Sequence, residues 1–160
     1  MRFTLIKDLK QDRSMRPILN GLLSFTLIYL TTDIYVTNLS FGLFSEQIIT
    51  TLFGNLDEFI DPITQASFLE YIHTQIFFMM MIVLTLSAIY IRMANKTSYS
   101  ITIVNLLMIS ALLNLITLGL SYFVNKSFIN LYVILFFSWH TLALYMSMFA
   151  LWRLNFAKSI

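Results

Sequence analysis

Four apolar stretches, each about as long as a lipid bilayer is thick, take up most of this 160-residue chain. They cover residues 18–39, 67–91, 101–124 and 131–152. An α-helix needs about 20 apolar residues to cross a hydrocarbon core of roughly 30 Å. Because lipid offers no partner to backbone N–H and C=O groups, spans of this length are helices. The sequence therefore predicts an all-α integral membrane protein with four transmembrane helices in an antiparallel bundle.

Composition narrows the class of protein further. The chain is 58% hydrophobic and 11% charged, whereas a soluble domain has about 25% charged residues. Residues 1–160 are therefore read as one transmembrane domain. The absence of cysteine excludes disulfides, thiolate metal sites and a cysteine nucleophile. A net charge of +2 gives no nucleic-acid footprint, and we find no hydrolase or nucleotide-binding motif.

The basic residues predict the orientation of the spans. Nine of the ten lysine and arginine residues precede the first span, separate the second from the third, or follow the fourth, and only Lys126 falls on the other side. By the positive-inside rule both termini are cytoplasmic. We therefore expect a multi-pass protein of the cell inner (plasma) membrane, whose first span stays in the mature chain as a signal anchor.

Two connecting regions carry their own patterns. Residues 1–17 mix basic and apolar side chains and are expected to form an amphipathic segment on the cytoplasmic leaflet. Residues 40–66 form the extracytoplasmic loop, where Ser45 can cap a short interfacial helix that Gly54 ends. Asp61 as N-cap and Pro62 as first helical residue are expected to start the next helix.

Four titratable side chains fall within the spans: Asp33, Glu70, His73 and His140. At a rise of 1.5 Å per residue, Asp33 and His73 lie about 9 Å from the outer ends of their spans, and His140 about 13 Å. All four are therefore expected in the outer half of the membrane. Ionisable groups at such depth usually face the bundle interior and mark functional sites.

Helical spacing predicts which face of each span points inward. The predicted inward faces are Thr26, Tyr29, Asp33 and Thr37 in the first span; Glu70, His73, Phe77 and Leu84 in the second; Ser110, Asn114, Thr117 and Ser121 in the third; and His140, Ala143 and Ser147 in the fourth.

The leading functional hypothesis is a haem b or metal site. His73 and His140, on different helices, could ligate a haem iron from its two sides, and electron transfer would follow. A single transition-metal ion could instead be held by His73 and His140 together with Glu70 or Asp33. Phenylalanines and methionines near both histidines could enclose the macrocycle.

The alternative hypothesis is a non-catalytic accessory or transport subunit of a larger membrane complex. Asp33 could pair with His73 or His140 and set the register of the helices. The same groups could form a proton or ion path. The polar groups stop near mid-membrane, so such a path would need a homo-oligomer or a membrane-protein partner.

Overall fold

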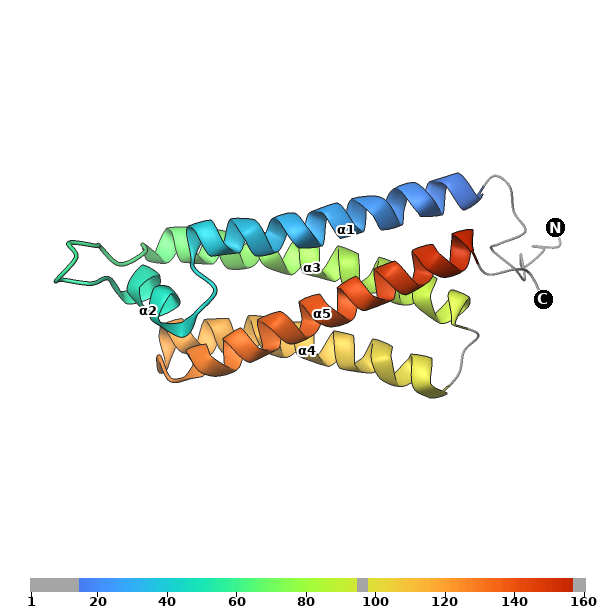
Figure 1. Ribbon diagram of the computed structural model, residues 1–160. Coiled ribbons are helices and arrows are strands. Elements are labelled where there is room, and N and C mark those ends of the chain that lie inside the picture. The colour runs from blue at the N-terminus through green and yellow to red at the C-terminus, as the bar shows by residue number, and fades with distance from the viewer. Residues whose placement is uncertain (1–14, 95–97, 157–160) are drawn as a thin grey trace.

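The computed structural model describes residues 15–94 and 98–156, and every regular element in these residues is a helix. The elements are α1 (Met15–Ser40), α2 (Ser45–Phe53), α3 (Gln65–Met93), α4 (Ser98–Phe123) and α5 (Phe128–Asn155). The four long helices run along one another, and the short α2 lies at one end (Figure 1). The predicted amphipathic segment 1–17 falls largely outside the described residues.

The four long helices are the predicted membrane spans. They have 26 to 29 residues each and are long and apolar enough to cross a bilayer. Each contains its predicted span apart from Val124, which follows α4, and extends beyond it by a few residues at most ends. The prediction of a four-span, all-α membrane bundle is confirmed.

Each end of the bundle has its own interhelix contacts. Asn20 of α1 and Asn155 of α5 exchange side-chain hydrogen bonds of 3.1 and 2.8 Å, so the start of α1 lies against the end of α5. We call this the terminal end. At the opposite end, the α2 end, Ser45 Oγ donates to Asn130 Oδ1 of α5 at 2.6 Å. The arrangement is visible in Figure 1.

Two apolar clusters fill the interior. The larger one joins the four long helices through residues such as Leu30, Leu86, Leu107 and Trp139. The smaller one ties α2 to the ends of α3, α4 and α5, with Ile48, Phe68, Leu118 and Ile129 among its members.

Small and hydroxyl side chains line the buried faces of α4 and α5. Ala143 and Ser147 of α5 are fully buried, as their spacing predicts, and small residues of this kind let helix backbones approach closely in lipid. The predicted inward face of α4 is also buried, and the hydroxyls of Ser110, Thr117 and Ser121 donate to carbonyls of their own helix. Their hydrogen-bonding needs are thus met without a partner helix.

The loop between α2 and α3 covers residues 54–64, so α3 begins later than predicted. Gly54 ends α2 with a φ of 77°, and a Cβ there would lie 2.7 Å from the carbonyl oxygen of Ile60. The predicted start of the next helix at Asp61 and Pro62 is wrong, since α3 begins at Gln65. Thr64 is the N-cap, and its hydroxyl accepts from the Ser67 N–H at 3.2 Å. The predicted cap at Ser45 is also wrong, since Ser45 is the first residue of α2 and Phe44 is its N-cap. The side-chain oxygen of Gln47 accepts hydrogen bonds from the backbone N–H groups of Leu43 and Phe44.

The orientation of α3 corrects another prediction. The face that carries Glu70, His73, Phe77 and Leu84 is exposed rather than inward. The opposite face is the buried one and includes Phe68, Met79, Val83, Leu86 and Tyr90. In lipid both faces of a span can be apolar, so apolar residues do not show which face points inward. The positions of Glu70 and His73 therefore led to the wrong prediction of the inward face of α3.

Candidate functional site

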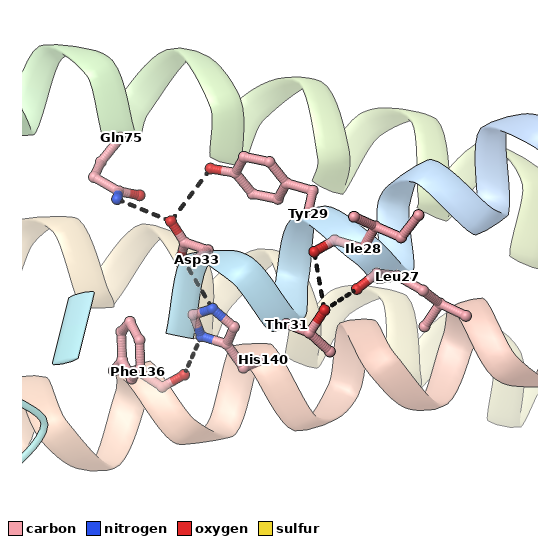
Figure 2. Close-up of polar contacts among 8 residues, drawn as sticks. All are labelled: Leu27, Ile28, Tyr29, Thr31, Asp33, Gln75, Phe136 and His140. Carbon is pink, nitrogen blue, oxygen red and sulfur yellow. Dashed lines mark hydrogen bonds and ion pairs between the residues drawn. The ribbon is translucent and has the colours of Figure 1, made fainter. Parts of the chain in front are cut away.

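A buried carboxylate and a buried imidazole meet between α1 and α5. The side chains of Asp33 on α1 and His140 on α5 are 8% and 2% exposed. His140 Nε2 and Asp33 Oδ2 are 3.1 Å apart (Figure 2). Of the four titratable residues predicted to share a site, the structure brings these two together. We call them the Asp33–His140 pair.

Two further side chains complete the contacts of Asp33. Its Oδ1 accepts a hydrogen bond from the Tyr29 hydroxyl at 3.4 Å and another from Gln75 Nε2 at 3.3 Å. Tyr29 lies one turn from Asp33 on α1, whereas Gln75 reaches across from α3 (Figure 2). Both carboxylate oxygens are therefore occupied, and one side chain joins three helices.

The contact of the other ring nitrogen fixes the tautomer of His140. Its Nδ1 lies 2.9 Å from the carbonyl oxygen of Phe136. A carbonyl oxygen only accepts, so Nδ1 carries the hydrogen and donates. Either Nε2 then donates to an ionised Asp33, or a protonated Asp33 donates to Nε2. In both states the pair holds one shared proton and has no net charge.

A second set of polar groups continues from the pair toward the α2 end. The Tyr71 side chain on α3 has Thr37, Gln75 and Tyr132 as polar neighbours. Thr37 and Tyr132 are 2% and 3% exposed and come from α1 and α5. Gln75 therefore lies between the Asp33–His140 pair and a cluster of Tyr71, Thr37 and Tyr132 nearer the end of the bundle.

Aromatic rings enclose the imidazole on the other sides. The ring centroids of Phe136 and Trp139 lie 4.2 and 3.9 Å from that of His140. Toward the terminal end the neighbours belong to the apolar core, with Leu30 and Ala143 fully buried. Apart from Tyr29, which lies on the terminal side of Asp33, the polar side chains around the pair lie toward the α2 end.

Glu70 and His73 do not join this site. Both are exposed on α3, and neither has a hydrogen bond or ion pair to a described residue. Over residues 15–94 and 98–156, no group of three or more histidine, aspartate and glutamate side chains is placed to hold a metal ion. The structure therefore adds no support to the haem or metal hypothesis.

The aromatic residues that were expected to enclose a macrocycle are only partly buried beside a histidine. Of the aromatic residues near the two histidines, Phe136 is buried beside His140, whereas Phe77 and Phe78 are 54% and 43% exposed. An open surface groove of about 590 Å³ lies between α4 and α5, and none of the four titratable residues lines it.

Sequence reasoning missed the contribution of α3 to the site. Gln75 and Tyr71 are four residues apart and so share a helix face, which was the only available signal. That signal was weak, because glutamine and tyrosine carry no charge at neutral pH. The nearby titratable residues Glu70 and His73 favoured the opposite face of the helix.

The chain matches the model of a protein family. Residues 42–159 match the model of the Aq_1264_TM family, which is described as a transmembrane helical domain. The chain belongs to this family. No curated protein and no solved structure matches the chain.

The match to the Aq_1264_TM family covers most, but not all, of the site. It includes α2 to α5, and with them Gln75 and His140. It begins after α1, so Asp33 and Tyr29 lie outside the matched residues. The family description agrees with a helical membrane protein and names no ligand or activity.

Proposed function

We propose that this protein is a non-enzymatic accessory subunit of a membrane complex, in which the Asp33–His140 pair serves helix assembly. The observation that carries the proposal is the use of every polar side-chain atom of the pair inside the bundle. Both oxygens of Asp33 and both ring nitrogens of His140 have partners on α1, α3 or α5. Such pairs set helix register where lipid supplies no hydrophobic drive for association.

The same contacts weigh against haem b or metal binding by His73, His140, Glu70 and Asp33. An iron or metal ion needs a free ring nitrogen, and His140 would have to release Phe136 or Asp33 to provide one. His73 is exposed, so it is not on the side of α3 that approaches His140. Electron transfer would require this arrangement to change.

A proton-binding role is the second candidate function. It is favoured by the hydrogen bond from Gln75 to Asp33 and by the polar side chains of Tyr71 and Tyr132, which lie beyond Gln75, nearer the α2 end. Carboxylate and histidine chains in membrane helices commonly carry protons. In this role the pair would exchange its shared proton with the α2 side and pass it to a partner subunit, because the apolar core separates it from the terminal end.

The orientation in the membrane is also part of the proposal. Arg16 and Arg153 lie on α1 and α5 at the terminal end, and Arg92 lies in the last turn of α3. The loop at the α2 end carries Asp57, Glu58 and Asp61. The positive-inside rule then puts the terminal end in the cytoplasm of a cell whose inner (plasma) membrane holds the protein.

The accessory-subunit proposal is tested by purifying the tagged protein from its own membranes in a mild detergent. We expect a native complex that contains other polypeptide chains, no Soret band in the visible spectrum, and no stoichiometric transition metal. The matched control is the His73→Asn variant, which should retain the same other polypeptide chains because His73 does not contact the Asp33–His140 pair.

Two results would contradict the proposal. A stoichiometric haem or metal that disappears in both His73→Ala and His140→Ala would establish cofactor binding instead. Recovery of this chain alone, as a monomer or as an assembly of identical copies, would exclude the role of accessory subunit. For the second candidate, proton uptake into proteoliposomes of the purified complex should be lost in Asp33→Asn and kept in Glu70→Gln.

A further inference from the structure

One side of α3 presents a continuous exposed stripe. It consists of Glu70, His73, Phe77, Met80, Met81 and Leu84, which we call the α3 stripe. Successive members are one to four residues apart and fall within about 100° of arc at 3.6 residues per turn. The apolar members are 49–55% exposed. The α3 stripe therefore joins two polar side chains to an apolar surface on one helix face.

His73 lies at nearly the depth of the buried site. His73 is two residues from Gln75, whose side chain donates to Asp33. At 1.5 Å per residue, the two positions differ by only about 3 Å along the helix axis. They point about 160° apart around α3, so His73 faces outward at nearly the depth where Asp33 is buried.

Outward exposure at this depth is unfavourable in a single copy of the chain. Ionisable residues in transmembrane segments almost always face other protein or water rather than lipid. Asp33 and His140 meet this condition by pairing, whereas Glu70 and His73 have no ion pair or hydrogen bond to any residue that the structure describes. The stripe is thus a surface that another protein element should cover.

We propose that a second copy of this chain covers the stripe, with Glu70 of each copy contacting the partner subunit's His73. The two residues are three positions apart, so they lie about 4.5 Å apart along the axis. When two parallel α3 helices pack about a two-fold axis normal to the membrane, residue 70 of each helix faces residue 73 of the other. Each copy supplies one carboxylate and one imidazole, and both contacts form together.

The rest of the stripe suits the same packing. Phe77 and Leu84 follow His73 at helical spacing, and the unbranched side chains of Met80 and Met81 adapt to an irregular partner surface. Ala88 lies one turn beyond Leu84, toward the terminal end, and is exposed. Its small side chain allows close approach of the two helices there. A lipid acyl chain could cover these apolar residues but would leave Glu70 and His73 without partners.

Crosslinking tests the interface directly, because the chain contains no cysteine. We expect Phe77→Cys to give dimers with a short bifunctional thiol crosslinker in native membranes. The matched control is Leu112→Cys, which is 60% exposed on α4 and lies outside the stripe. Equal crosslinking of the two variants, or none in Phe77→Cys, would overturn the proposal.

A charge exchange in the Phe77→Cys background tests the reciprocal contact. Glu70→His alone or His73→Glu alone places like side chains opposite each other and should reduce dimer formation about tenfold. The double exchange Glu70→His with His73→Glu restores both contacts and should restore the dimer. Failure of the double exchange to restore it would refute the pairing, provided that circular dichroism shows equal helicity in all variants. None of these substitutions touches the Asp33–His140 pair, so the result is independent of the accessory-subunit proposal.

Discussion

Replacing His140 by leucine is expected to lower the free energy of unfolding by about 3 kcal/mol. The substitution leaves Asp33 buried with no partner for Oδ2, although Tyr29 and Gln75 still donate to Oδ1. A carboxylate at 8% exposure between membrane helices must then either stay charged without its counter-ion or take up a proton. Unfolding in mixed micelles, followed by circular dichroism, measures the loss.

The double variant separates a role in assembly from a role in chemistry. Asp33→Leu combined with His140→Leu removes both polar groups, and replacing a buried ion pair by apolar residues of similar size is often nearly neutral. We expect the double variant to regain most of the stability that the single variants lose. A double variant as unstable as the sum of the two single variants would show that the two side chains do not interact.

Replacing Phe68 by alanine is expected to cost about 3–4 kcal/mol. Phe68 is fully buried where α2, α3, α4 and α5 meet, and its ring lies 3.9 Å from that of Tyr122. The substitution opens a cavity that neither lipid nor the short α2 can fill. The same micelle unfolding measurement applies, and loss of the α2 contacts should appear as faster proteolysis of the loop at residues 54–64.

The matched control for Phe68 is Phe25 on α1, which is 72% exposed. Phe25→Ala should change the free energy of unfolding by less than about 0.5 kcal/mol, because lipid or detergent fills the space that the ring leaves. A similar loss in both variants would mean that Phe68 does not act through packing at the α2 end.

The spans could be predicted from the sequence because their length and hydropathy are set by the bilayer itself. The buried stripes on α4 and α5 could also be predicted, since Ser110, Asn114 and Ala143 are small or polar amid larger apolar residues. The inward face of α3 could not. Its buried face is as apolar as its exposed face, and lipid removes the contrast that distinguishes core from surface in soluble proteins.

The candidate site was partly predictable for a related reason. Depth counting indicated that Asp33 could meet either histidine, but depth carries no information on which side of a helix a residue lies. The choice of His140 depends on α1 packing against α5, a tertiary contact with no local signal. Gln75 was missed because an uncharged amide in a span gives little evidence of its role until its partner is known.

Both ring nitrogens of His140 have hydrogen-bond partners inside the bundle. The protonation of Nδ1 is the most direct test of this arrangement. The chain has two histidines, so the His73→Asn variant leaves His140 as the only imidazole signal in ¹⁵N NMR spectra. We predict an Nδ1 with a directly bonded hydrogen that exchanges slowly with solvent, as its donation to Phe136 requires. An Nδ1 without a hydrogen, or one that exchanges as fast as an exposed imidazole, would contradict the account.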